Sequence, residues 1–174
     1  MEVDKKYGLF KPGTNVLDLG CSPGSWAKYA AEQVGPSGTV LGVDLKEPEA
    51  DFSNYARFQK IDVFELSWKD LMAEGRFDVI LSDMAPATTG VKIVDQARSA
   101  ELMRTAMQIA GFALKSGGAL LVKVFQGPDV EELFKELAGR FQTIRRIKPK
   151  SSRSFSPEIF GLATGHILEK EKNT

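Results

Sequence analysis

Four ionisable side chains stand where apolar runs of this 174-residue sequence end or are interrupted. Asp44, Asp62 and Asp83 each follow such a run, and Lys123 lies within the run 119–125. A carboxylate in such a position can accept hydrogen bonds from the two hydroxyls of a ribose, and a lysine with a lowered pKa can act as a general base. Aspartates also begin turns and cap helices, and most lysines extend into solvent. Each residue taken singly therefore favours the plainer structural role.

The segment Val16–Trp26 predicts a ligand-binding loop near these acids. Its sequence, VLDLGCSPGSW, passes from an apolar strand through glycine and proline to the start of an amphipathic helix. Gly20 and Gly24 lack Cβ atoms that would block a ligand, and the helix start offers unpaired N–H donors. Asp44 lies 20 positions after Gly24 (44 − 24), the spacing at which an acid binds the ribose of a dinucleotide. An ordinary tight turn would show the same loop, but the loop and three acids together favour a nucleotide-like ligand.

The elements that must position these residues alternate between strand and helix. Apolar runs predict strands over 14–20, 39–44, 56–61, 77–83 and 119–125, and helical spacing predicts helices over 25–34, 66–73, 95–114 and 129–141. Two further strands, 143–147 and 159–167, follow with no helix between them, which favours an antiparallel hairpin. Strand-helix alternation forces parallel pairing with right-handed crossovers, so we predict a doubly wound α/β sheet. Ligands of such sheets bind outside the carboxyl ends of the strands, where the acids stand.

Composition limits the classes of protein that remain. The chain is 43% hydrophobic and 26% charged, as expected for a single globular domain spanning 1–174. It has no apolar run near the ~20 residues that cross a bilayer and no secretory signal at its N-terminus, so we expect a cytoplasmic protein without membrane contact. Cys21 and His166 are the only cysteine and histidine, so we expect neither a disulfide framework nor a metal site. We also expect a monomer.

Several segments together resemble one known family. They are VLDLGCSPGSW, GVDL, KIDV, VILSDMAP, LLVKVFQG and KPKSSRSFSPEIFGLATG. Across nearly the whole chain they are similar to the FtsJ/RrmJ (RlmE) ribosomal RNA ribose 2′-O-methyltransferases, with Cys21 where the family usually has alanine. The spacing of 40 residues between Asp83 and Lys123 (123 − 83) makes the resemblance far more specific than a glycine loop. It implies a Rossmann-like methyltransferase fold with a mostly parallel seven-stranded sheet, helices on both faces and an antiparallel C-terminal hairpin.

The same resemblance implies an activity and the residues that carry it. The activity is transfer of a methyl group from S-adenosylmethionine to a ribose 2′-hydroxyl of RNA, with large-subunit ribosomal RNA favoured. By position, the cofactor site comprises Gly20, Gly24, Trp26, Asp44, Asp62 and Asp83, and the catalytic residues are Asp83, Lys123 and Glu158. Lys123 is expected to accept the hydroxyl proton or to orient the hydroxyl, with Asp83 and Glu158 fixing its position. Taken alone, Glu158 is a solvated residue that opens the last strand, and Trp26 is a residue that packs the first helix.

One catalytic lysine of the family has no counterpart in this chain. By alignment it would precede Met1, in a basic segment that the sequence does not contain. Either the chain has been shortened there or this protein dispenses with the residue. A non-catalytic RNA-binding or ribosome-assembly factor therefore stays open as an alternative. A nicotinamide-dinucleotide oxidoreductase is a weaker one, because the loop reads G-C-S-P-G-S rather than G-x-G-x-x-G.

A local cluster of basic residues is the candidate RNA surface. The whole chain carries 23 basic and 23 acidic residues, so its net charge gives no indication of nucleic-acid binding. Between residues 140 and 153, however, six basic residues occur without an acid. From them we select Arg145, Arg146, Lys148, Lys150 and Arg153 as candidate contacts to an RNA backbone. A charged edge hairpin that resists aggregation would show the same pattern.

Overall fold

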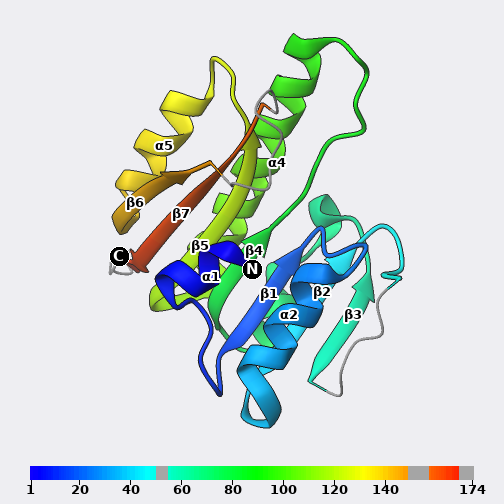
Figure 1. Cartoon of the computed structure of the whole chain (residues 1–174), viewed down its shortest axis with the longest axis vertical. Helices are drawn as coiled ribbons and strands as arrows, with labels where there is room; N and C mark the ends of the chain where they lie inside the picture. Colours follow the sequence, from blue (N-terminus) through cyan, green and yellow to red (C-terminus); the bar gives the residue numbers. More distant parts are fainter. Residues whose placement is uncertain (50–54, 149–156, 169–174) are drawn as a thin grey trace.

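The computed structural model describes residues 1–49, 55–148 and 157–168, and its centre is a seven-stranded sheet (Figure 1). The strands are β1 (Asn15–Leu19), β2 (Thr39–Asp44), β3 (Ala56–Lys60), β4 (Phe77–Ser82), β5 (Leu114–Phe125), β6 (Phe141–Ile147) and β7 (Glu158–His166). They lie in the order β3-β2-β1-β4-β5-β7-β6. The first five pair in parallel, and β7 is antiparallel to both of its neighbours. The predicted mostly parallel sheet with antiparallel C-terminal strands is therefore confirmed.

The position of β7 between β5 and β6 was not predicted from the sequence. The last two strands pair with each other as expected, but β7 also pairs with β5 and so separates β5 from β6. Because β7 runs antiparallel to β5, its first residue, Glu158, lies opposite Phe125. The start of β7 is thereby brought to the carboxyl end of the parallel strands.

Helices cover both faces of the sheet, as the alternation of elements predicted. The short α1 (Glu2–Tyr7) and α2 (Ser25–Val34) lie on one face, and α3 (Trp68–Ala73), α4 (Lys92–Ala113) and α5 (Val130–Ala138) lie on the other (Figure 1). Two 3₁₀ turns, Gly35–Ser37 and Val63–Glu65, follow α2 and precede α3. Among the described residues, no helix is long and apolar enough to cross a membrane.

Alternating burial along the strands creates the two layers. On β1, Leu17 packs into the core beneath α4, whereas Val16 packs into the core beneath α2. The residues of α2 that face the sheet recur every three or four positions and include Ala27, Ala30 and Val34. This spacing gives a helix one apolar face, which is why the sequence indicated the helix.

Several element boundaries differ from the predictions, including the starts of α4 and β5 and the end of α5. α4 begins at Lys92 rather than at residue 95. β5 begins at Leu114 rather than at residue 119, and its register with β4 shifts between Phe77 and Val79. α5 ends at Ala138 rather than at residue 141, because Phe141 already belongs to β6.

Helix α1 was not predicted from the sequence. It has six residues, too few to be stable by local interactions alone. Its Asp4 carboxylate accepts hydrogen bonds from the backbone N–H of Phe10 at 3.0 Å and from the hydroxyl of Tyr29, on α2, at 2.9 Å. Val3 packs into the core beside α2. Tertiary contacts therefore hold this helix against the rest of the fold.

Candidate active site

The glycine loop and Asp44 meet at the carboxyl edge of the sheet. After β1, the N–H groups of Gly20 and Cys21 donate to the carbonyl oxygen of Val43, on β2, at 2.8 and 3.2 Å. The loop continues to Ser22, whose N–H donates to Oδ2 of Asp44 at 2.9 Å. The predicted proximity of the loop to Asp44 is therefore present.

Each glycine of the loop has its own structural reason. Gly20 has a φ of 76°, and a Cβ atom there would lie 2.7 Å from Cγ of Met84 and 3.0 Å from its backbone. The loop can therefore pack against the segment after β4 only with glycine at this position. Gly24 has a φ of 109° and immediately precedes α2, so the first turn of that helix faces the same edge. A role of either glycine in holding a ligand stays a prediction.

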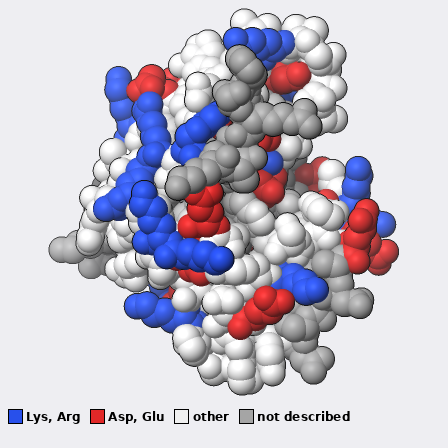
Figure 2. Space-filling model, in the orientation of Figure 1, with Lys and Arg blue, Asp and Glu red and all other residues white. Residues whose placement is uncertain are grey.

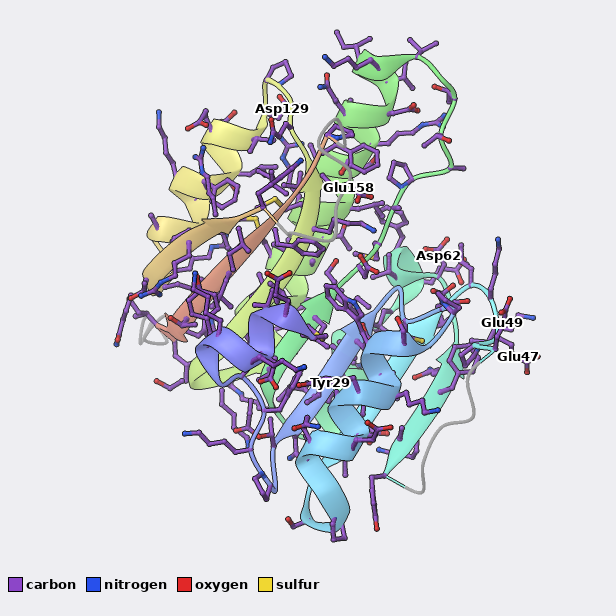
Figure 3. All side chains as sticks on the ribbon, in the orientation of Figure 1. Tyr29, Glu47, Glu49, Asp62, Asp129 and Glu158 are labelled. Atoms are coloured by element: carbon purple, nitrogen blue, oxygen red, sulfur yellow. The ribbon has the colours of Figure 1, made fainter. Side chains whose placement is uncertain are left out.

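Asp44 and Asp62 both make the turn-forming contacts that the plainer interpretation expects. Oδ1 of Asp44 accepts from the N–H of Lys46 at 2.8 Å, and Oδ1 of Asp62 accepts from the N–H of Phe64 at 3.0 Å. Each carboxylate oxygen has two lone pairs, so these bonds leave capacity for a ligand hydroxyl. Figure 3 shows Asp62 beside the turn that precedes α3 and Glu158 at the start of β7.

Asp18 is a notable ionisable residue at this edge that sequence reasoning did not select. It lies on β1 with no exposed surface, and neither of its carboxylate oxygens has a hydrogen-bond partner within the described ranges. Burial raises the pKa of Asp18 to about 7, and the nearby charges of Asp83 and Asp44 act in the same direction. The signal was available in the sequence, because Asp18 interrupts an apolar strand as Lys123 does.

Lys123 lies between the two carboxylates that were predicted to position it. Its Nζ is 2.7 Å from Oδ1 of Asp83 and 3.9 Å from Oε1 of Glu158. The lysine side chain is 11% exposed, so it does not extend into solvent. Burial raises the pKa of Asp83, while Lys123 acts in the opposite direction. The structure therefore brings together the three predicted catalytic residues, although their roles stay a prediction.

Trp26 joins α2 to this centre. Its ring lies 5.4 Å from the ring of Phe160, centroid to centroid, at an interplanar angle of 36°. Phe160 is the β7 residue directly opposite Lys123 on β5. Trp26 therefore packs α2 against the sheet, as one of its two predicted roles requires. This packing places the indole near the position of Lys123 on β5.

The thiol of Cys21 is poorly suited to act as a nucleophile at this site. The thiol is 3% exposed, and burial raises its pKa to about 12, followed by the effect of Asp18. A buried neutral thiol is a poor nucleophile. Within the part of the chain that the structure describes, no group of three or more His, Cys, Asp or Glu residues is arranged to hold a metal ion.

Among the described candidates for RNA binding, the neighbouring residues Arg145 and Arg146 contact different helices. The guanidinium of Arg146 donates to Oε2 of Glu131, on α5, at 2.8 Å, and it lies 4.3 Å from the ring centroid of Phe134. Arg145 instead lies 5.6 Å from the ring centroid of Tyr7, on α1. Nζ of Lys148 donates to the carbonyl oxygen of Glu158 at 3.0 Å. Lys150 and Arg153 lie outside the described residues.

Known proteins match this chain along almost its full length. A family model described as FtsJ-like methyltransferase matches residues 1–166. Ribosomal RNA large subunit methyltransferase E of Oleidesulfovibrio alaskensis is 47% identical over 167 residues, which cover 94% of this chain and 81% of that protein. The protein of the same name from Bdellovibrio bacteriovorus is 43% identical, with 91% of this chain and 83% of the relative covered.

Solved structures show the same architecture. A protein from Plasmodium falciparum described as a ribosomal RNA methyltransferase superposes with a TM-score of 0.84 at 27% identity, covering 97% of this chain and 94% of that one. A protein from Clostridium thermocellum superposes with a TM-score of 0.64 at 18% identity, covering 94% of each chain, which supports the fold alone. These matches confirm the resemblance carried by the sequence motifs. The chain belongs to the FtsJ-like methyltransferase family.

Proposed function

We propose that this protein transfers the methyl group of S-adenosylmethionine to a ribose 2′-hydroxyl of RNA, with large-subunit ribosomal RNA as its substrate. Its relatives are named ribosomal RNA large subunit methyltransferase E, which supports the substrate class. The single observation that carries the reaction type is the buried Lys123, held by Asp83 and Glu158 at the carboxyl edge of the sheet. With such a substrate, the protein would act in the cytoplasm, where bacterial ribosomes are assembled.

The residues at this edge fit S-adenosylmethionine. Asp18 is a buried carboxylate with both oxygens lacking a partner among the described side chains, and Asp44 and Asp83 lie near enough to raise its pKa. Such a concentration of acids favours a ligand with positive charges. Gly24, Trp26, Asp44, Asp62 and Asp83 would hold the cofactor, and Gly20 would shape the loop. When bound, S-adenosylmethionine supplies an electrophilic methyl group on a sulfonium.

Lys123 is the group that would handle the hydroxyl of the substrate. In the reaction, the ribose oxygen forms a bond to the methyl carbon, the bond from that carbon to sulfur breaks, and the hydroxyl proton leaves. Once the Lys123 ammonium has passed a proton to Asp83, its amine accepts the hydroxyl proton. Alternatively, the ammonium donates a hydrogen bond to the ribose oxygen and orients a lone pair toward the methyl group, while Asp83 takes the hydroxyl proton. The raised pKa of Asp83 supports such sharing between the two groups. Glu158 fixes the lysine from the β7 side.

The first test compares two lysines of the same strand. Lys123→Ala is expected to lower the rate of methyl transfer by about 100-fold or more, because general acid–base groups contribute about that much. The matched control is Lys115→Ala, which removes a lysine that pairs with Asp78 at 2.8 Å at the other end of β5. Tritiated methyl transfer to ribosomal RNA and to ribosomal subunits, at saturating RNA and cofactor, gives the rates.

The outcome also separates the alternatives. A wild-type rate in Lys123→Ala would contradict the proposed role of the lysine. A wild-type protein that binds RNA but transfers no methyl group would support the non-catalytic assembly factor instead. Calorimetry with S-adenosylmethionine and with NAD separates the methyltransferase from the oxidoreductase, and membership of the FtsJ-like family supports the former.

A further inference from the structure

Adjacent arginines of β6 point to opposite faces of the sheet. Arg146 pairs with Glu131 and packs over Phe134, and both of these residues belong to α5. Arg145 lies near Tyr7, which belongs to α1 on the other face. Side chains alternate along a strand, so two neighbouring positive charges in the sequence cannot face the same ligand surface.

Arg145 shares its face with the candidate catalytic lysine. Residues directly opposite each other on neighbouring strands point to the same side of a sheet. Across β6, β7 and β5, Arg145 lies opposite Leu162, which lies opposite Leu121. Two positions further along, Ile147 lies opposite Phe160, which lies opposite Lys123. Arg145 and Lys123 therefore occupy neighbouring rows on the face that carries α1 and α2.

Helix α1 extends this face with an aromatic ring and more positive charge. Nζ of Lys6 lies 5.2 Å and Cζ of Arg145 lies 5.6 Å from the ring centroid of Tyr7. Lys6 and Arg145 are exposed and Tyr7 is half-buried. The hydrogen bonds of Asp4 to Phe10 and Tyr29 fix the helix that presents them. Figure 2 shows this face, with Lys and Arg side chains gathered over the half of the molecule that holds α1 and β6.

We propose that Lys6, Tyr7 and Arg145, here called the Tyr7 platform, bind single-stranded RNA beside the nucleotide that is methylated. An aromatic ring flanked by cations suits this ligand, because bases stack on the ring and phosphates pair with the cations. The platform lies on the same sheet face as Lys123, so one RNA strand reaches both. Arg146 makes no RNA contact, because it faces α5 and its charge is paired with Glu131. The inference rests on the proposed function, since it identifies the substrate-binding surface of that site.

The test uses Arg145→Ala, Tyr7→Leu and the matched control Arg146→Ala. Binding of a fluorescent oligouridine and of large-subunit ribosomal RNA is measured over a series of salt concentrations. Arg145→Ala is expected to weaken binding and to reduce the slope of log K against log salt by about 0.7, the value for one contact to single-stranded phosphate. Tyr7→Leu is expected to weaken binding about tenfold with an unchanged slope, because it removes a stacking platform and no charge. Arg146→Ala is expected to bind both RNAs like the wild type.

Two rescue variants distinguish a ligand contact from a structural role. Tyr7→Phe keeps the ring and is expected to bind RNA like the wild type, and Arg145→Lys is expected to restore the salt slope. In methyl transfer, Arg145→Ala and Tyr7→Leu are expected to raise KM for RNA while kcat and the affinity for S-adenosylmethionine stay unchanged. Far-ultraviolet circular dichroism and thermal unfolding of each variant check that it is folded.

The proposal has clear contrary outcomes. If Arg145→Ala and Arg146→Ala lost equal RNA affinity, the assignment of RNA binding to the sheet face that carries α1 would be overturned. If Tyr7→Leu bound RNA like the wild type, the stacking role of Tyr7 would be overturned. A failure of the proposed function looks different. In that case the wild-type protein transfers no methyl group, while RNA binding still depends on Tyr7 and Arg145 and not on Arg146, which supports the platform.

Discussion

Lys123 illustrates how a buried charge is tolerated in this protein. A lysine inside an apolar strand is destabilising when it has no partner. Here Asp83 lies 2.7 Å from the ammonium, and Glu158 lies at 3.9 Å on the β7 side. Two carboxylates against one lysine leave this cluster acidic, which suits the nearby binding of a cation.

Asp18 is expected to make the stability of the protein depend on pH. Its pKa is about 7 in the folded chain and near 3.8 in the unfolded chain. The folded state therefore binds the proton more tightly. The stability linked to this proton is fully present below about pH 4 and is lost as the pH rises through about 7, by up to about 4 kcal/mol. Urea unfolding between these pH values measures this loss.

The variant Asp18→Asn tests the assignment. Asparagine has nearly the shape of the protonated acid and cannot ionise, so the variant is expected to lack this part of the pH dependence and to be more stable than the wild type at pH 8. Asp129→Asn, at the residue before α5, is the matched control and is expected to follow the wild type. A parallel fall in stability with pH in Asp18→Asn would assign the effect to another group.

The Asp4 carboxylate is a main contact that holds helix α1 against the rest of the fold. Asp4→Ala removes the acceptor for both Tyr29 and the N–H of Phe10 and leaves two donors without their partner. The free energy of unfolding is expected to fall by about 1–3 kcal/mol. Hydrogen exchange of residues 2–7 is expected to rise, and RNA binding through the Tyr7 platform is expected to weaken. Tyr29→Phe, which removes one of the two bonds, is expected to have a smaller effect. Unchanged exchange in Asp4→Ala would contradict this account of α1.

The loop after β1 is expected to tolerate no side chain at Gly20. Gly20→Ala combines a positive φ with a Cβ atom 3.0 Å from the backbone of Met84. We therefore expect the free energy of unfolding to fall by about 3 kcal/mol. Gly90→Ala is the matched control, because Gly90 has a similar φ of 81° but nothing within 4 Å of an added Cβ atom. It is expected to lose only about 1 kcal/mol, from backbone strain. Denaturant unfolding of both variants gives the difference, and equal losses would refute the contact with Met84.

The whole sheet explains how distant segments meet at one edge. Parallel strands β1, β2, β4 and β5 end on the same side, which gathers Asp44, Asp83 and Lys123 there. Glu158 reaches this edge by a different route, because β7 runs antiparallel beside β5. With a parallel last strand, Glu158 would lie at the opposite end of the sheet, far from the lysine.

Local pattern was enough to predict most elements and the outline of the site. Strand β2 and helix α2 have the predicted bounds, because their apolar spacing and their glycine boundaries act within a few residues. The acids at strand ends were predicted to converge because parallel strands share a carboxyl edge. The organisation as one domain spanning 1–174 stays a prediction.

Other features could not be predicted, since they depend on contacts between distant residues. Helix α1 is held by tertiary contacts, among them those to Phe10 and Tyr29, and Asp18 has a raised pKa because the fold buries it beside other acids. The division of Arg145 and Arg146 between two faces requires knowing which helix covers each side of β6.

The amino-acid sequence thus determined the family, the alternation of strands and helices, and the residue types available for chemistry, since these follow from local spacing and motif. Only the tertiary structure revealed which of those residues meet. The order of the strands placed β7 beside β5, and that placement set Glu158 near Lys123. Burial then determined which charges are paired and which, like Asp18, lack a partner among the described residues.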